Sequence, residues 1–305
     1  MPAMALQKTL IVVVGPTAIG KTALAIKLAQ HFDTEVISAD SRQFFKEMEI
    51  GTAKPSTEEL AAAPHHFINS HSVQTLFSTG DFESQALLLI ESLFKTHQIL
   101  IMVGGSGLYI DALCKGLDAL PDTNMNIREQ LNLQLANEGI EAIKSQLAEH
   151  DPEYYAKVDQ ANPQRMIRGL EFFLSTGTKL SAHLTNSKKI RPFKIVKIGL
   201  NMDRAALYER INLRVDQMMS AGLLEEVKSL QAFRNYNALN TVGYSELFAH
   251  LDGDLSLAEA VEKIKQNTRR FAKRQLTWFR RDDSTAWFEP NQQDAVINHI
   301  VQQIS

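Results

Sequence analysis

The stretch VVVGPTAIGKTAL, residues 12–24, decides how the chain begins to fold. An apolar, β-branched run leads into a turn bounded by Gly15 and Gly20, and an apolar helical spacing follows. The pattern G-x-x-x-x-G-K-T between a strand and a helix binds phosphates, because backbone N–H groups and the positive helix end face the phosphate oxygens. Lys21 adds a positive charge, and the Thr22 hydroxyl is placed to ligate Mg²⁺. The spacing therefore predicts a polyphosphate site and leaves open which polyphosphate binds.

Strand and helix patterns alternate around this loop. Apolar strand patterns begin at residues 9, 35, 98 and 193, and helical patterns cover residues 21–32, 81–97 and 203–230. Such alternation predicts βαβ units, so we expect an α/β fold with a P-loop parallel sheet core flanked by helices. Residues 125–185 are helical and polar without a strong strand pattern. We therefore expect an all-helical domain, residues 123–189, inserted into a core of residues 1–122 and 190–305 that includes the C-terminal helices.

Composition excludes several classes of protein. The 305 residues are 44% hydrophobic with a net charge of −3, so a sizeable core is available and bulk charge does not indicate nucleic-acid binding. The single cysteine, Cys114, excludes an internal disulfide and a multi-cysteine zinc site. No segment approaches the roughly 18 unbroken apolar residues of a membrane span. We expect a cytoplasmic protein with no membrane contact, and a monomer, because no long apolar face is left over.

The segment SADSRQFFKEMEIGTAKP, residues 38–55, follows the second predicted strand. Asp40 therefore lies at the edge of the sheet where ligands of open α/β sheets bind. A carboxylate there can cap the next helix, hold Mg²⁺ through water or accept a proton, and the residues alone favour a cap or metal partner. Arg42 and Gln43 carry a fork-shaped cation and an amide able to pair with a base edge, with surface solvation as the alternative.

The segment ILIMVGGSGLYI, residues 99–110, is where a P-loop NTPase usually carries its second acid. Here the predicted strand ends in Gly104, Gly105 and Ser106, and no carboxylate follows. This argues against a standard nucleotide hydrolase. The glycines allow either close approach of a substrate to the backbone or tight packing of a helix on the strand.

Two arginine pairs fall at helical spacing. Arg165 and Arg168 are three residues apart, and Arg210 and Arg214 are four apart, so each pair shares one helix face. Such pairs suit oxyanions, although solvated faces and intrahelical ion pairs are the common alternative.

The segment NTRRFAKRQLTWFRR, residues 267–281, is the strongest indication of nucleic-acid binding. Cations alternate there with Phe271, Trp278 and Phe279, a mixture that can meet phosphates and stack on bases. An ordinary amphipathic helix is the alternative. The neighbours His65 and His66 point to opposite faces of an extended segment, so a structural role is favoured over metal binding.

In this order the segments resemble the tRNA dimethylallyltransferases, or isopentenyl-tRNA transferases, from Lys8 to Trp287. The matching motifs are GPTAIGKT, SADSRQFFKEMEIGTAKP, HHFIN, VGGSGLYIDAL, NPQRMIRGLE, RINLRVDQMMSAGLLEEV, TVGYSEL and KRQLTWFRR. The motif at 38–55 is specific to that family. Departures are small: Ile19 stands where many members have Ser, and Ser106 replaces a frequent Thr.

The resemblance implies transfer of the dimethylallyl group from dimethylallyl diphosphate to the exocyclic N6 amine of the adenosine 3′ of the tRNA anticodon, position 37. Diphosphate leaves, and ATP is not hydrolysed. Asp40 matches the family's general base, which overrules the cap-first ranking. Lys21, Thr22 and Arg214 match the catalytic positions that grip the diphosphate, with Mg²⁺ as cofactor and Thr22 as its ligand.

The resemblance also assigns binding residues. Diphosphate binding falls to the whole loop: Gly15, Pro16, Thr17, Ala18, Ile19, Gly20, Lys21 and Thr22. Contacts with tRNA fall to Asp40, Ser41, Arg42, Gln43, Ser106, Arg128, Gln164, Arg165, Met166, Ile167, Arg168, Lys273, Arg274, Gln275, Leu276, Thr277, Trp278, Phe279 and Arg280. The helical insertion would contact the anticodon stem-loop, and the target base would be flipped into the core.

Three other readings stay open at this point. A P-loop small-molecule kinase or NTPase would consume ATP. A related prenyltransferase would use a free adenine nucleotide as acceptor, although the helical insertion and the basic segment near the C-terminus favour tRNA. A non-catalytic RNA-binding protein would leave the phosphate loop without a purpose.

Overall fold

A computed structural model describes residues 7–185 and 187–304, and the chain divides into two compact units. The first is Met1–Lys115 with Ile190–Ser305, and the second is Gly116–Lys189. The sequence predicts an insertion over 123–189, whereas the second unit begins at Gly116. Gly116 has a φ of +82°, and a Cβ there would lie 2.5 Å from the side chain of Lys189. The two ends of the insertion therefore pack against each other.

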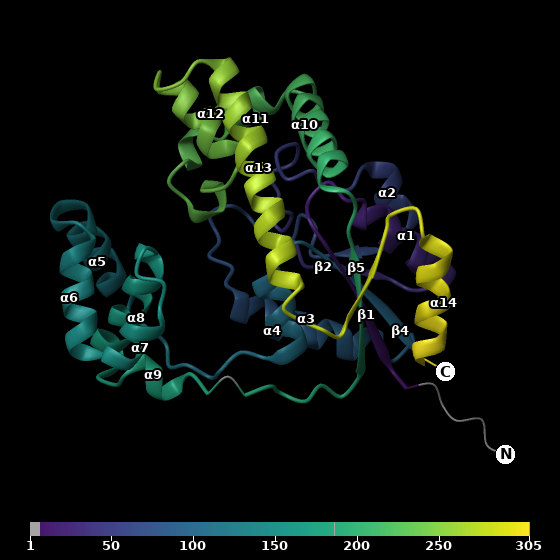
Figure 1. Cartoon of the computed structure of the whole chain (residues 1–305), viewed down its shortest axis with the longest axis horizontal. Helices are drawn as coiled ribbons and strands as arrows, with labels where there is room; N and C mark the ends of the chain where they lie inside the picture. The colour runs from purple at the N-terminus through teal and green to yellow at the C-terminus, as the bar shows by residue number, and fades with distance from the viewer. Residues whose placement is uncertain (1–6, 186, 305) are drawn as a thin grey trace. The chain divides into compact units, whose positions relative to one another are not determined.

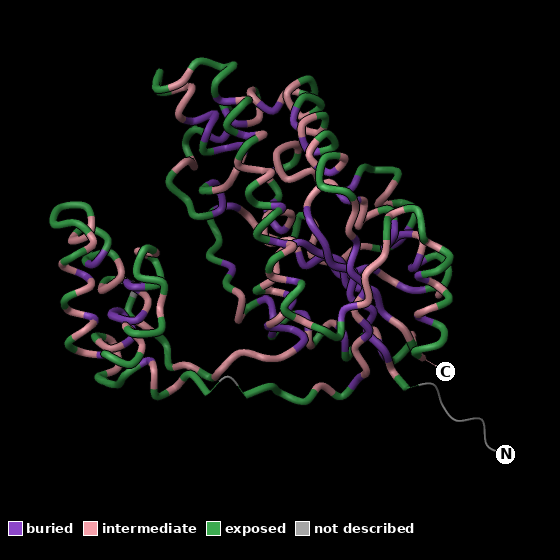
Figure 2. The backbone as a smooth tube through the Cα atoms, in the orientation of Figure 1, coloured by how far each residue is buried: buried purple, intermediate pink, exposed green. Residues whose placement is uncertain are grey.

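In the described part of the first unit, six strands form one sheet in the order β3-β2-β4-β1-β5-β6, and every pair is parallel. The strands are β1 (Thr9–Val14), β2 (Val36–Ser38), β3 (His65–His66), β4 (Ile99–Val103), β5 (Lys194–Leu200) and β6 (Thr285–Phe288). Every residue of β1 is buried, as expected for a central strand covered on both faces. Figure 2 shows this buried strand core.

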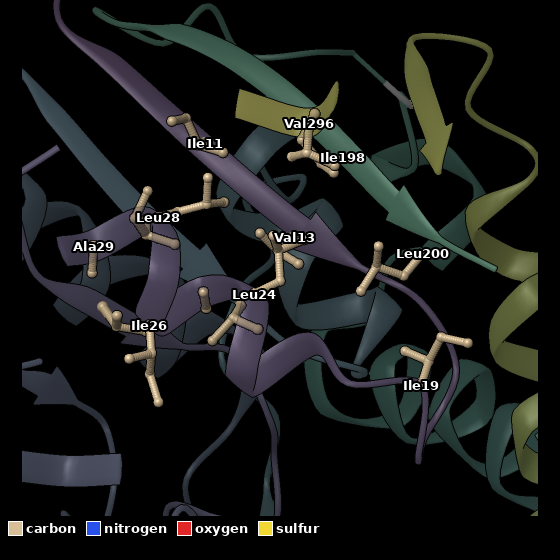
Figure 3. Close-up of a cluster of buried hydrophobic side chains, with 14 of the residues drawn as sticks. Ile11, Val13, Ile19, Leu24, Ile26, Leu28, Ala29, Ile198, Leu200 and Val296 are labelled. Carbon is tan, nitrogen blue, oxygen red and sulfur yellow. The ribbon is translucent and has the colours of Figure 1, made fainter. Parts of the chain in front are cut away.

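Helices cover both faces of the sheet (Figure 1). Side chains of β1 alternate between them: Ile11 and Val13 join one apolar cluster, and Leu10 and Val12 join the other. The first cluster includes residues of α1 (Lys21–His31), α10 (Arg204–Ser220) and α14 (Gln293–Ile304). The second includes residues of α3 (Thr79–Leu93) and α4 (Gly107–Lys115). In Figure 3, Val13 on β1 lies beside Leu24 on α1, which shows how burial fixes α1 to the sheet.

A third apolar cluster joins the helices near the C-terminus. These are α10, α11 (Leu223–Ser229), α12 (Tyr244–Leu251) and α13 (Leu257–Phe279), and a short α2 (Thr57–Ala62) precedes β3. The helical pattern over 203–230 forms two helices, because Gly222 adopts φ +100° between α10 and α11.

The second unit is helical throughout its described residues. It contains α5 (Met125–Glu138), α6 (Ile140–His150), α7 (Pro152–Lys157), α8 (Pro163–Thr176) and α9 (Leu180–His183). Its core is formed by Leu131, Ile143, Leu147, Met166, Ile167 and Leu170. Among the helices described in either unit, none combines the length and apolar character needed to cross a bilayer.

Candidate active site

Loops from neighbouring strands converge at one edge of the sheet. Because β2, β4 and β1 are adjacent and parallel, the segments that follow them share the carboxyl edge. These segments contain Asp40 after β2, Gly104–Ser106 after β4, and the glycine-rich loop Gly15–Gly20 after β1. The sheet order thus brings together motifs that are distant in the sequence.

At both ends of the loop after β1, the backbone has a conformation that favours glycine. Gly15 has φ +146°, and a Cβ there would lie 2.7 Å from the carbonyl oxygen of Leu200. Gly20 has φ +102° at the N-cap of α1 and offers no side-chain acceptor. The first-turn N–H groups of α1 are therefore left for a ligand, at the positive end of the helix dipole.

Cations from α1 and α10 surround this loop. Lys21 Nζ donates to the Pro16 carbonyl oxygen at 2.8 Å. Arg210 Nε donates to the Ala18 carbonyl oxygen at 3.0 Å, and Arg214 Nη1 donates to Thr17 Oγ1 at 3.4 Å. The prediction that the α10 arginines share one face is confirmed, and that face meets the loop.

Burial changes the acidity of these cations. Desolvation lowers the pKa of Lys21 to about 8, opposed by the nearby Asp40 carboxylate and assisted by the Arg214 charge. Burial also lowers the pKa of Arg214, again opposed by Asp40. Both groups are charged at neutral pH in a desolvated site, which strengthens their attraction for an anion.

Two cavities meet at Asp40. The polar cavity, of about 70 Å³, is lined by Lys21, Thr22, Ser38, Asp40 and other residues. The large cavity, of about 400 Å³, is lined by Asp40, Arg42 and Ser106 and by apolar side chains of the helices: Leu108, Val215, Met218, Phe271 and Trp278. Thr17, Asp40, Arg214, Phe271 and Gln275 line both cavities. A carboxylate at this junction can accept a proton from a group in either one.

Asp40 also forms a local turn. Its Oδ1 accepts the backbone N–H of Arg42 at 3.1 Å. No helix begins here, because the next one, α2, is capped by Ser56, so the predicted helix-capping role is not found. The turn instead holds the carboxylate in place. The turn is compatible with a proton-accepting role, because a carboxylate offers further lone pairs.

The glycines after β4 pack against the protein itself. A Cβ at Gly104 would lie 2.4 Å from the Ala39 carbonyl oxygen, and one at Gly107 would lie 2.4 Å from Trp278 Cδ1. These glycines therefore allow close packing, and they also line the two cavities, so close approach of a substrate to their backbone stays a prediction. Ser106 Oγ accepts the Ser41 N–H at 3.0 Å and so joins the loops after β4 and β2.

Gln275 ties α13 to the site. Its Oε1 accepts the Thr17 N–H at 2.8 Å, and its Nε2 donates to the Gly105 carbonyl oxygen at 2.9 Å. The side chain is 6% exposed. Gln275 therefore positions the glycine-rich loop, a role that the sequence does not reveal.

The remaining candidate tRNA contacts on α13 fall into two groups. Lys273, Arg274, Thr277 and Arg280 are exposed. Phe279 is buried, and Leu276 and Trp278 are half-buried. The exposed group leaves cations available to a phosphate backbone, whereas the buried group contributes to packing.

After β2, Arg42 and Gln43 are engaged by the chain itself. Arg42 donates to the carbonyl oxygens of Asn237 and Asn240, and Gln43 Nε2 donates to Ala53 O at 3.1 Å. Both residues hold surrounding loops in place.

Glu226 is a residue of the site region that sequence reasoning missed. Its carboxylate accepts the N–H groups of Glu49, Ile50 and Gly51 and the hydroxyl of Tyr244. Gly51 lines the large cavity, so this carboxylate fixes part of its wall. The only signal is a glutamate pair at a helix start, and its partners lie far away in sequence.

In the second unit, the residues predicted to contact tRNA differ in how far they are buried. Glu171, which is fully buried, accepts hydrogen bonds from Arg128, and Arg168 lies 3.5 Å from it. Gln164 and Arg165 are exposed. Met166 and Ile167 belong to the core of this unit, so their side chains are unavailable to RNA.

The two histidines form the edge strand β3, and each has a partner within the protein. His66 Nε2 lies 2.6 Å from a Glu35 carboxylate oxygen, and His65 Nδ1 lies 2.7 Å from the Ala63 carbonyl oxygen. In the described chain, no cluster of three or more His, Cys, Asp or Glu side chains is suited to a metal ion.

Comparisons with known proteins agree on one family. Residues 43–282 match the family model described as IPP transferase. A tRNA dimethylallyltransferase of Christiangramia forsetii is 54% identical over 280 residues, covering 92% of this chain and 93% of that protein. Another, from Bacteroides fragilis, is 46% identical and covers 96% of this chain and 97% of that protein.

Solved structures give the same result. A tRNA isopentenylpyrophosphate transferase from Bacillus halodurans aligns with a TM-score of 0.73 at 36% identity, covering 98% of this chain and 97% of that one. A eukaryotic dimethylallyltransferase described as acting on tRNA aligns with a TM-score of 0.77 at 26% identity, covering 98% and 80%.

Proposed function

The chain belongs to the IPP transferase family of tRNA dimethylallyltransferases, and we propose that it moves a dimethylallyl group from dimethylallyl diphosphate to the N6 amine of adenosine 37 in tRNA. The observation that carries the proposal is Asp40, which lines both the polar cavity and the large cavity. One cavity suits the anionic leaving group and the other an aromatic acceptor, with a proton acceptor between them.

In the proposed reaction, the amine nitrogen attacks the first carbon of the allylic chain. The bond from that carbon to oxygen breaks, and its electron pair leaves with the diphosphate. The proton lost from the amine goes to a carboxylate oxygen of Asp40. An aryl amine is a weak nucleophile, so stabilising the leaving group and removing this proton are the two tasks of the site.

The loop and its cations perform the first task. Lys21 and Arg214 contact the loop at Pro16 and Thr17. We propose that these cations, with N–H groups of the loop and α1, bind the diphosphate and neutralise charge that grows as the bond breaks. Arg210 holds the loop through the Ala18 carbonyl oxygen. Because these groups are fixed before substrate binds, little reorganisation accompanies the reaction.

The donor set of the polar cavity fits Mg²⁺. Thr22 offers a hard oxygen ligand there, and the diphosphate would supply more. Mg²⁺ usually keeps several waters beside one or two protein oxygens, so the small number of carboxylates is no obstacle. When bound, the ion neutralises the leaving diphosphate.

The acceptor side of the proposal rests on the large cavity and the exposed cations. Apolar side chains such as Leu108 and Phe271 offer surfaces for a flipped base. Lys273 and Arg274 on α13, and Arg165 on α8, are exposed and free to meet the RNA backbone. We propose that each unit, taken by itself, offers these cations to the anticodon stem-loop.

The proposal is tested with labelled dimethylallyl diphosphate, Mg²⁺ and either unmodified tRNA or AMP, without ATP. Label is expected in tRNA alone. Label in AMP alone would indicate a free-nucleotide acceptor, and label in neither would refute the prenyl-transfer reaction. A dependence on ATP would support the kinase alternative.

Asp40→Asn tests the base within the same assay. The variant keeps the shape of the side chain, and we expect turnover to fall by about 100-fold or more while diphosphate and tRNA still bind. Asp294→Asn is the matched control, because Asp294 lies in an exposed ion pair with Lys27. Near-normal turnover of Asp40→Asn would refute the assignment of the base.

A further inference from the structure

Asp111 lies outside the groups that the proposed reaction uses, yet it contacts the wall of the large cavity. Trp278 Nε1 on α13 donates to Asp111 Oδ2 on α4 at 2.8 Å. Trp278 lines the large cavity and is absent from the described lining of the polar cavity. A change at Asp111 that moves Trp278 is therefore expected to alter the large cavity and not the polar cavity.

The indole ring is confined on several sides. Gly107 lacks the Cβ that would lie 2.4 Å from Trp278 Cδ1, so the ring packs on the start of α4. The Arg281 guanidinium lies 5.5 Å from the ring centroid. The hydrogen bond to Asp111 adds a third restraint, on rotation about the side-chain torsions χ1 and χ2 of Trp278.

A carboxylate is a suitable anchor at this point. A half-buried indole N–H without a partner loses its hydrogen bond to water and gains none in return. Lys115 Nζ lies 2.7 Å from Asp111 Oδ1, so the carboxylate is itself held in place by a charge one helical turn away. Lys115 also lies 3.5 Å from Asp282, which pairs with Lys197 on β5.

We infer that Asp111 is a positioning residue that holds the Trp278 indole as a fixed wall of the large cavity and thereby controls binding of the acceptor adenosine. The inference rests on the proposed function, because the large cavity is there the acceptor site. Without the anchor, the ring has room to swing into the cavity of about 400 Å³ and obstruct the base.

Steady-state kinetics test the inference. Asp111→Ala is expected to raise the KM for an anticodon stem-loop RNA by about tenfold, the effect of one charge-assisted hydrogen bond, and to leave the KM for dimethylallyl diphosphate unchanged. Asp111→Asn is expected to restore most of the affinity, because its amide oxygen still accepts the indole N–H. An equal rise in both KM values would overturn the inference.

Lys115→Met is the matched control. It removes the charge beside Asp111 but leaves the oxygen that accepts from Trp278. Its KM for RNA is expected to stay within about twofold of the wild type. A loss equal to that of Asp111→Ala would show that the ion-pair cluster, not the indole contact, supports activity, and would overturn the inference.

A double-mutant cycle isolates the contact. Trp278→Phe keeps an aromatic ring but removes the N–H, so Asp111→Ala added to it is expected to cause little further change in the KM for RNA. Effects that simply multiply would show that Asp111 acts elsewhere. Melting temperatures of all variants check that each is folded.

A spectroscopic readout separates this inference from the proposed function. The chain has two tryptophans, so Trp287→Phe leaves Trp278 as the only reporter. Adding Asp111→Ala is expected to raise acrylamide quenching of Trp278 fluorescence by about twofold, as the ring loses its anchor. Unchanged quenching overturns the inference whatever the activity; failure of the wild type to modify tRNA overturns the proposed function alone.

Discussion

The arginines of α10 and those of the helical unit differ in the groups that surround their positive charges. Arg214 is half-buried beside the glycine-rich loop, and in the described part of the chain it has no carboxylate at ion-pair distance. Arg128 and Arg168 both lie against the buried carboxylate of Glu171. A desolvated cation without such a partner is costly, so we expect Arg214 to bind an external anion. Arg128 and Arg168 are already part of the protein's own structure.

This difference distinguishes arginines that can bind a ligand from arginines that stabilise the protein itself. Helical spacing identifies arginines that share a face, but burial and the nearest carboxylate decide whether the charge is available to a ligand. Of the three arginines predicted to contact tRNA in the helical unit, Arg165 is the exposed one. Four changes test the distinction.

The largest effect is expected at Arg214. Arg214→Ala removes a desolvated charge facing the diphosphate and is expected to raise the KM for dimethylallyl diphosphate by about 100-fold, with a smaller loss for Arg214→Lys. Initial-rate kinetics at saturating tRNA measure this. Arg128→Ala is the comparison, and an equal loss there would remove the distinction between the two arginine groups.

The second effect is on stability, at Glu171. Glu171→Gln weakens the pairing of Arg128 in a buried setting and is expected to destabilise the protein by about 2 kcal/mol at pH 7, with no change in the KM for dimethylallyl diphosphate. Thermal unfolding measures the loss. A rise in that KM would contradict the structural role of this cluster.

The same variant has a defined pH dependence. Burial opposes ionisation of Glu171, but hydrogen bonds and charge from Arg128, with Thr123 and Arg168, hold its pKa below the ordinary 4.5. A depressed pKa contributes stability above the unfolded value, and that contribution is lost as pH falls through the folded value. The difference in melting temperature between wild type and Glu171→Gln is therefore expected to shrink below pH 4.5.

The third effect concerns Lys21. Its pKa of about 8 means that the charge is present at pH 7 and is lost as pH rises through 8. Diphosphate affinity is therefore expected to fall by about tenfold between pH 7 and pH 9. Calorimetric titration measures the affinity, and Lys21→Arg is the control because its charge persists. An equal decline in both proteins would locate the titration on the ligand.

The smallest effect is expected at Arg165. Arg165→Ala removes one exposed cation and is expected to weaken RNA binding by about threefold and to reduce the salt slope by about one unit. Fluorescence anisotropy over a salt series measures both quantities. Lys27→Ala, in the exposed pair with Asp294, is expected to leave RNA binding unchanged; an equal loss would indicate a bulk charge effect.

Local patterns made much of the fold predictable. The loop Gly15–Thr22 can be identified because its requirements lie within eight consecutive residues, and β1 and α1 follow from apolar spacing. The edge strands β3 and β6 have two and four residues, too few for a periodic signal. Their pairing depends on the sheet that they join.

The site was less predictable where distant partners decide a residue's role. Gln275 contacts Thr17 across 258 residues of sequence, and Tyr244 reaches Glu226 from another helix. Met166 and Ile167 fall within a motif that suggests tRNA contact, but they face the core of their own unit. The sequence identifies such a motif, but only the packing shows which of its side chains face outward and which are buried.

The sheet order also determines how much of the chain the ribosome must synthesise before the central strands can pair. β1 pairs with β5, with Thr9 opposite Lys194, so one edge of the innermost strand stays unpaired until nearly two-thirds of the chain has been made. The whole of Gly116–Lys189 emerges in that interval. An open apolar strand edge is a template for aggregation. The inserted helices can fold from local contacts within that interval, so the open edge of β1 is the part that waits for β5.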